Sequence, residues 1–145
     1  MSQQESMLVV SAHAADFVWR AGGAVALAAS RGDRVTVLCL SYGERGESAS
    51  AWRAGKTLEE IKAQRRGEAE SAAAALGAAI EFLDAGDYPL RETDELVDRI
   101  VGVYREVNPS VVLTHTLADP YNGDHPAAGQ MALRARVLAQ AVGYP

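Results

Sequence analysis

The chain has 145 residues, 48% of them hydrophobic, which is enough to bury one apolar core, so we expect a single domain over residues 1–145. The formal net charge of −5 and the isoelectric point of about 5.2 leave no basic field for holding a nucleic acid backbone or an anionic membrane surface. No apolar run approaches the roughly 20 residues that span a bilayer, and the start "MSQQES" lacks the build of a signal peptide. We therefore expect a cytoplasmic protein that binds neither nucleic acid nor membrane.

The first half of the chain alternates short apolar runs with segments of helical spacing. Residues 7–11 form the first run, and apolar side chains from Phe17 to Ala28 then repeat at helical intervals. A second run at 35–40 contains the single cysteine, Cys39, which we expect to be a buried core thiol. Both runs, like two later runs at 80–83 and 111–114, are rich in β-branched residues and lack strict polar alternation. This pattern favours strands buried on both faces of a parallel sheet.

The second half of the chain repeats this alternation. A capping box of Thr57 and Glu60 begins a predicted helix that ends before Gly77, a residue suited to a left-handed cap. Further along, the pattern predicts a strand at 80–83, a helix between Leu96 and Val107, and a strand at 111–114. A last helix is expected to follow, with Pro126 in its first turn. This order implies right-handed crossovers and a doubly wound, mostly parallel α/β sheet with helices on both faces.

Two clusters of metal-binding side chains follow the first and fourth predicted strands. The first cluster is "HAAD", with His13 and Asp16. The second, "THTLADPYNGDHP", contains His115, Asp119, Asp124 and His125. Ligands of doubly wound sheets gather at the carboxyl ends of the strands, so the clusters are adjacent if these two strands flank the switch point. His13, Asp16 and His125 would then form a three-ligand site with an open position, as in catalytic zinc sites.

A lone His-x-x-Asp pair also has a structural interpretation. In that interpretation the histidine is hydrogen-bonded near a helix start and Asp16 serves as the N-cap. On spacing alone this is the commoner arrangement. All three histidines of the chain, however, fall at predicted strand ends on one edge of the sheet, which favours a metal site.

The loop "SYGERGESASAW" after the second predicted strand lies at the same carboxyl edge. Its length and polarity put Glu44, Arg45 and Glu47 within reach of the site, although a charged loop can also be a solvated surface. The chain contains no G-x-G-x-x-G dinucleotide turn, no G-x-x-x-x-G-K-[ST] phosphate loop and no G-x-S-x-G nucleophile elbow. The usual sequence grounds for a dinucleotide enzyme, an NTPase or a serine hydrolase are therefore missing.

The motifs "AHAAD", "AGG", "GERGE", "RRGE" and "GDHPAAG", in this order, are similar to those of the PIG-L or LmbE family of zinc-dependent enzymes. That family includes N-acetylglucosaminyl deacetylases and has a Rossmann-like fold. The resemblance implies that His13, Asp16 and His125 are ligands of Zn²⁺ or another divalent metal. This agrees with the site inferred from the strand ends.

One position departs from the deacetylase pattern. In the deacetylases the first motif reads A-H-P-D-D-E, and the carboxylate just before the ligand aspartate is the general base. Here that position is Ala15, and a methyl group cannot accept a proton. The stretches "SAHAADFVWRAGG" and "YGERGES" instead resemble the 4-oxalomesaconate hydratases of this family, which add water to a carbon-carbon double bond in the bacterial breakdown of gallate.

Hydration of an unsaturated oxo-tricarboxylate needs a delivered hydroxide, a sink for charge and a proton donor. A zinc ion can lower the pKa of bound water to about 7 or polarise the substrate's oxygens. We predict that Glu47, or else Glu44, is the acid or base, and prefer Glu47 because it lies deeper in "GERGES". Arg45 and Arg20 are candidates to pair with the carboxylates of a small anionic substrate, although a solvated helix position is the more ordinary interpretation of Arg20.

Members of this family usually continue well beyond 145 residues, and a later histidine that often helps to stabilise the oxyanion has no match here. We therefore expect that the family's C-terminal portion is missing or that another chain supplies the remaining groups. An incomplete sheet would expose an edge, which favours a homo-oligomer. Two other functions stay open: a zinc-dependent N-deacetylase or amidohydrolase acting on an N-acetylated sugar or small conjugate, and a non-catalytic metal-binding assembly protein.

Overall fold

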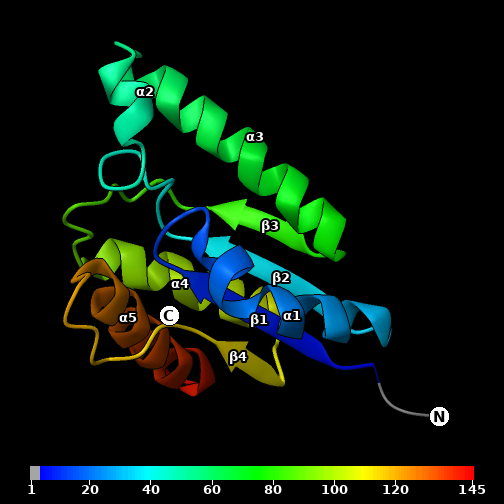
Figure 1. Cartoon of the computed structure of the whole chain (residues 1–145). Helices are drawn as coiled ribbons and strands as arrows, with labels where there is room; N and C mark the ends of the chain where they lie inside the picture. The colour runs from blue at the N-terminus through cyan, green and yellow to red at the C-terminus, as the bar shows by residue number, and fades with distance from the viewer. Residues whose placement is uncertain (1–3) are drawn as a thin grey trace.

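A parallel sheet forms the centre of the fold (Figure 1). The computed structural model describes residues 4–145, and the strands in this range are β1 (Ser6–Ser11), β2 (Arg34–Cys39), β3 (Ala79–Phe82) and β4 (Val111–Leu113). They lie in the order β3-β2-β1-β4, and all pairs are parallel. The strand order therefore reverses at β1, so the switch point lies between β1 and β4, the two strands that the sequence analysis required to be neighbours.

Helices cover both faces of the sheet, which confirms the predicted fold class. The helices α1 (Asp16–Ser30) and α3 (Leu58–Leu76) pack on one face, and α4 (Asp94–Val107) and α5 (Asp124–Gln140) pack on the other. Figure 1 shows α1 in front of the sheet and α4 behind it. A short helix that was not predicted, α2 (Ala49–Arg53), lies in the loop after β2.

Successive strand residues divide between two apolar cores. Leu8, Val10 and Leu38 face the side of α4 and α5, whereas Val9 and Val37 face the side of α1 and α3. Burial on both faces explains why β1 and β2 lack polar alternation. The edge strands differ, because β3 and β4 are only partly buried, so the expectation of burial on both faces is correct for the two central strands alone.

The predicted helix signals near α3 are confirmed. The Thr57 hydroxyl accepts a hydrogen bond from the Glu60 N–H, and the Glu60 carboxylate accepts one from the Thr57 N–H. Gly77 follows the helix with a φ of +79°. Cys39 is fully buried in the core beneath α1 and α3, and this burial raises the pKa of its thiol.

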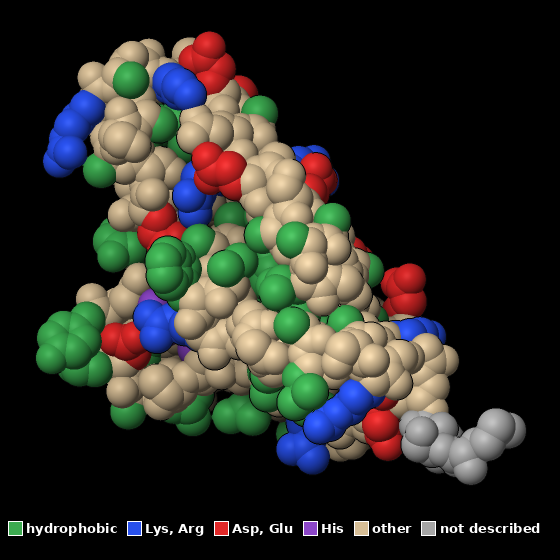
Figure 2. Space-filling model, turned by 45° about the vertical axis from the view of Figure 1, so that its right-hand side comes forward, with side chains coloured by type: hydrophobic (Ala, Val, Ile, Leu, Met, Phe, Trp, Pro, Cys, Tyr) green, Lys and Arg blue, Asp and Glu red, His purple; other side chains and the backbone are tan. Residues whose placement is uncertain are grey.

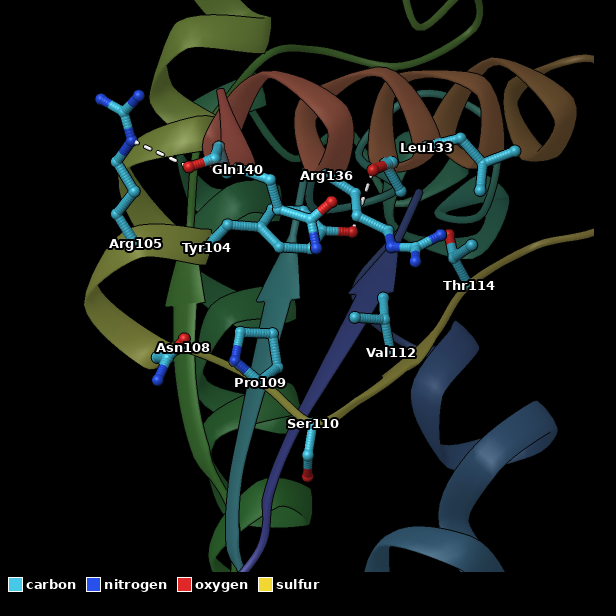
Figure 3. Close-up of a pocket in the computed structure, with 12 residues that line it drawn as sticks. Tyr104, Arg105, Asn108, Pro109, Ser110, Val112, Thr114, Leu133, Arg136 and Gln140 are labelled. Atoms are coloured by element: carbon cyan, nitrogen blue, oxygen red, sulfur yellow. Dashed lines mark hydrogen bonds between the residues drawn. The ribbon is translucent and has the colours of Figure 1, made fainter. Parts of the chain in front are cut away.

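A groove of about 550 Å³ lies between β4, α4 and α5, where β4 has no strand partner on its second side among the described residues (Figure 3). Tyr104, Val112 and Arg136 contribute to its lining, which includes none of the predicted site residues. This groove is therefore separate from the candidate site. Within residues 4–145, no helix combines the length and the hydropathy that are needed to cross a membrane.

A matched pair of leucines tests this arrangement of the core. Leu96 of α4 is buried against the sheet, whereas Leu27 of α1 is 51% exposed. Leu96→Ala should lower the free energy of unfolding by about 2–5 kcal/mol, because it removes buried methyl groups and leaves a cavity. Leu27→Ala should have a much smaller effect. Urea unfolding followed by circular dichroism measures both, and equal losses would contradict the assignment of α4 to the core.

Candidate metal centre

The first two candidate ligands lie where β1 turns directly into α1. Asp16 is the first residue of α1, and its Oδ2 accepts a hydrogen bond of 2.8 Å from the backbone N–H of His13. The N-cap position is occupied by Ala15, without a side-chain cap, so the N-cap interpretation of Asp16 is wrong. The same carboxylate oxygen lies 3.2 Å from His13 Nδ1, so Asp16 faces the histidine.

His125 reaches the centre from the other side of the switch point, as the second residue of α5. Its Nε2 lies 3.3 Å from Asp16 Oδ1. Its ring stacks on that of His115, with the centroids 4.2 Å apart and the planes 5° from parallel. His115 Nε2 accepts a hydrogen bond from the Ala12 N–H, so this third histidine packs beside the centre and holds the end of β1.

Four side chains converge on one point. His13, Asp16, Glu47 and His125 each offer a ligand atom, and all four atoms lie within 4.8 Å of one another. His13 Nδ1 and His125 Nε2 are buried and have no hydrogen-bond partner in the described structure. A buried polar atom without a partner is costly, and two such nitrogens beside a carboxylate fit the donor set of a divalent metal such as zinc.

Two further carboxylates orient the histidines. His13 Nε2 is hydrogen-bonded to Asp124 Oδ2, and His125 Nδ1 to Asp119 Oδ2, both at 2.8 Å. Each bond fixes its ring and directs the other nitrogen toward the centre, as outer carboxylates do in metal sites. Both aspartates belong to the second sequence cluster, but their roles could not be predicted, because spacing does not reveal which nitrogen each carboxylate meets.

The charges in the centre are strongly coupled. Burial alone would lower the pKa of His13, but the carboxylates of Asp16 and Asp124 outweigh burial and raise this pKa to about 9. Burial likewise opposes ionisation of Asp16, yet its contacts with His115 and His13 hold its pKa well below the usual range. The hydrogen bond with His125 lowers the pKa of Asp119 to about 2. The site thus stabilises a positive charge between the carboxylates, which a divalent cation would provide.

Glu47 enters from the loop after β2. Gly43 permits this fold-back, because its φ is +70° and a Cβ there would lie 2.8 Å from Glu47 Oε2. Glu47 Oε1 lies 3.4 Å from His13 Nδ1, and Oε2 lies 3.6 Å from a guanidinium nitrogen of Arg65. Burial raises the pKa of Glu47 despite the nearby charges of His13 and Arg65, although 28% of the side chain is still exposed.

The other predicted loop residues lie differently. Glu44 is buried outside the four-residue cluster, its carboxylate accepts a hydrogen bond from the Tyr42 N–H, and burial raises its pKa. The Arg45 residue is exposed, and its backbone N–H donates to Asp87. The geometry therefore favours Glu47 over Glu44 as the group that meets the substrate.

Arg20 lies on the first turns of α1, with its Nε 3.8 Å from Asp16 Oδ1 and 57% of its side chain exposed. It borders a hollow of about 210 Å³ that His115 and Asp119 also line. Figure 2 shows histidine at the base of a notch in the molecular surface, with acidic and basic side chains at its border. An anion that enters this side of the molecule would meet Arg20 beside the centre.

One organising residue was missed by the sequence analysis. Asp87 is buried, and its two oxygens accept hydrogen bonds of 2.9 and 2.8 Å from the N–H groups of Arg45 and Gly46. It thereby ties the segment after β3 to the loop that carries Glu47. A single aspartate between a strand and a helix carries no pattern from which this role could be predicted.

Known proteins resemble this chain over nearly its whole length. The family model described as GlcNAc-PI de-N-acetylase, PIG-L, matches residues 8–136. The 4-oxalmesaconate hydratase of Pseudomonas putida is 57% identical over 142 residues, which cover 97% of this chain and 55% of that protein. The 1D-myo-inositol 2-acetamido-2-deoxy-alpha-D-glucopyranoside deacetylase of Rhodococcus erythropolis is 32% identical, with 96% and 55% covered.

Among solved structures, the crystal structure of GalB, the 4-carboxy-2-hydroxymuconate hydratase of Pseudomonas putida KT2440, superposes with a TM-score of 0.94 at 54% identity. The match covers 98% of this chain and 59% of that one. The chain thus spans somewhat more than half the length of the relatives that it matches.

The metal ligands can be tested by substitution. His125→Ala removes one inward-facing nitrogen, so the purified variant should lose its divalent metal, as measured by elemental analysis after gel filtration. Asp119→Asn keeps every ligand atom but weakens the bond that orients His125, so metal affinity should fall by roughly 10- to 100-fold. Full metal occupancy in His125→Ala would contradict the assignment.

Proposed function

Because the chain belongs to the GlcNAc-PI de-N-acetylase (PIG-L) family, we propose that it is a metal-dependent hydratase that adds water to the carbon-carbon double bond of a 4-oxalomesaconate-like acid in aromatic acid breakdown. The observation that carries this proposal is Ala15, which leaves the position of the deacetylase base without a carboxylate, while Glu47 enters the centre from another loop. A sequence match at 57% identity and a solved structure at 54% identity, both from Pseudomonas putida KT2440 and both named as hydratases, support the assignment.

His13, Asp16 and His125 would hold the metal, and zinc suits a set of two imidazoles and one carboxylate. Bound there, a divalent metal supplies Lewis-acid chemistry, since it can acidify a water or polarise the oxygens of the substrate. Asp124 and Asp119 keep the two imidazoles in the orientation that this binding requires.

Glu47 would move the proton. Its carboxylate takes a proton from water as the water oxygen bonds to one alkene carbon, and the resulting acid gives a proton to the neighbouring carbon. Burial raises the pKa of Glu47, so its protonated form persists to a higher pH than that of an exposed glutamate. Arg65, 3.6 Å away, holds the carboxylate toward the centre.

Arg20 and Arg45 would bind the carboxylates of the substrate. The chain carries a net charge of −5, so a substrate with several negative charges needs cationic groups concentrated near the site. Arg20 borders the hollow beside Asp16, and Arg45 lies two residues before Glu47. The homo-oligomer and the cytoplasmic location expected from the sequence stay predictions.

A second candidate function is zinc-dependent deacetylation. The description of the family and the 32% identical deacetylase of Rhodococcus erythropolis favour it. Against it stands Ala15, because the deacetylase motif carries its general base at this position and alanine cannot accept a proton. Hydration is therefore the better supported of the two functions.

Paired glutamine substitutions test the role of Glu47. Glu47→Gln keeps the shape of the side chain and removes the titrating group, so turnover should fall by roughly 100-fold or more while the metal content is unchanged. Glu44→Gln, in the buried neighbour, should keep most of the turnover. The reverse pattern would assign the role to Glu44.

A side-by-side assay tests the reaction. The metal-loaded protein is given 4-oxalomesaconate, with loss of the conjugated chromophore as the readout, and N-acetylglucosamine conjugates, with release of free amine as the readout. Hydration should be the efficient reaction. Ala15→Asp should aid amine release slightly at most and should slow hydration, because a second negative charge then faces an anionic substrate. Efficient amine release without hydration by the unmodified protein would overturn the hydratase proposal.

A further inference from the structure

The ring of Tyr88 lies beside the metal centre. Tyr88 belongs to the segment between β3 and α4, and its ring packs directly on Gly46, where an added Cβ would lie 2.3 Å from ring atoms Cδ2 and Cε2. The centroid of the ring is 6.2 Å from that of His13, with the planes inclined at 46°. Tyr88 thus contacts the residue that precedes Glu47 and lies close to a metal-facing histidine.

The backbone of Tyr88 is held in an unfavourable conformation. Its φ is +50°, and the other non-glycine residues with positive φ in the described chain are Asp84 and Asn108. Aspartate and asparagine tolerate the left-handed region, whereas a bulky aromatic residue rarely adopts it. Strain of this kind persists where the surroundings impose it, and it is concentrated at functional sites.

Two buried carboxylates hold the backbone around Tyr88. Asp124, which orients His13, accepts hydrogen bonds from the Tyr88 N–H at 3.0 Å and from the Leu90 N–H at 2.8 Å. Asp87, the residue before Tyr88, holds the loop that carries Glu47 through the N–H groups of Arg45 and Gly46. The backbone that carries the ring is therefore tied to the carboxylate that orients His13 and, through Asp87, to the Glu47 loop.

The ring is nevertheless only half covered. Tyr88 is 53% exposed, although it stands beside a cluster in which His13 and His125 are buried. A rigid aromatic surface that is open to solvent on one side loses little conformational freedom when a ligand covers it. Aromatic rings stack favourably on other flat π systems.

We propose that Tyr88 contacts the substrate and selects flat, conjugated acids, whose unsaturated carbon chain stacks on the open part of the ring. This proposal rests on the proposed function, because it places the substrate between the metal ligands and the segment after β3. Gly46 is then required because any side chain at that position would displace the ring.

Binding of two dicarboxylates of equal length tests the proposal without turnover. The probes are trans,trans-muconate, which is flat and conjugated, and adipate, its saturated counterpart, titrated calorimetrically into the metal-loaded protein. The protein should prefer muconate. Tyr88→Ala should weaken muconate binding by roughly threefold to tenfold, the range expected for one lost aromatic stack, and should leave adipate binding nearly unchanged. Tyr88→Phe should bind both probes as the parent does.

Two variants guard this test against a purely structural effect. Gly46→Ala leaves Tyr88 intact but displaces its ring, so it should reproduce the selective loss of muconate binding. Tyr121→Ala removes a tyrosine that is 94% exposed on the loop after β4 and should change neither probe. An equal loss of both probes in Tyr88→Ala, or no loss of muconate binding, would overturn the proposal. If muconate selectivity depends on Tyr88 but 4-oxalomesaconate is not hydrated, the hydratase proposal fails and the Tyr88 proposal stands.

Discussion

The hydrogen bond between His13 Nε2 and Asp124 Oδ2 is the interaction on which the centre depends. It joins the end of β1 to the start of α5, positions separated by 111 residues, inside the protein. The same carboxylate also accepts hydrogen bonds from two backbone N–H groups of the segment after β3. These bonds stabilise its negative charge although the side chain is buried. With Nε2 occupied in this way, Nδ1 of His13 is the nitrogen left to face Asp16 and Glu47. One carboxylate thus sets the orientation of a candidate ligand and the path of a neighbouring loop.

The sheet topology brings the residues after β1 and β4 together. Because β4 pairs with β1, the residues that follow the two strands leave the sheet at the same edge and side by side. The bond from the Ala12 N–H to His115 Nε2 continues the contact of these strands beyond their last paired residues. On the other side of β1, β2 delivers the loop that carries Glu47. Three parallel strand ends therefore supply the four side chains of the candidate site.

The sequence predicted the structure well wherever a local pattern has one usual structural meaning. Unbroken β-branched runs predicted β1 and β2, Thr57 with Glu60 predicted the start of α3, and histidines at strand ends predicted where the candidate ligands converge. It did not predict features that depend on contacts between segments distant in the sequence. The partial exposure of β3 and β4 follows from their edge positions, and the role of Asp87 follows from a loop that closes over it. The preference for Glu47 over Glu44 rested on position in the motif alone, and only the structure shows that Glu44 is buried within its loop while Glu47 joins the cluster.

The charges in the centre explain how alanine at position 15, in place of the deacetylase carboxylate, suits the proposed anionic substrate. A carboxylate at Ala15 would stand next to Asp16 and add negative charge where an anionic acid has to approach. With alanine there, Asp16 and Glu47 are the carboxylates in the ligand cluster, and Glu47 lies beside the Arg65 guanidinium. The positive charge of Arg65 partly balances that of the Glu47 carboxylate, which reduces the repulsion of an incoming carboxylate. In the proposed mechanism, the group that moves protons lies on the β2 loop and not at the helix start, and its charge is balanced there by Arg65. This balance matters for the proposed unsaturated oxo-tricarboxylate, which is an anion, and would not matter for a small uncharged acetamide.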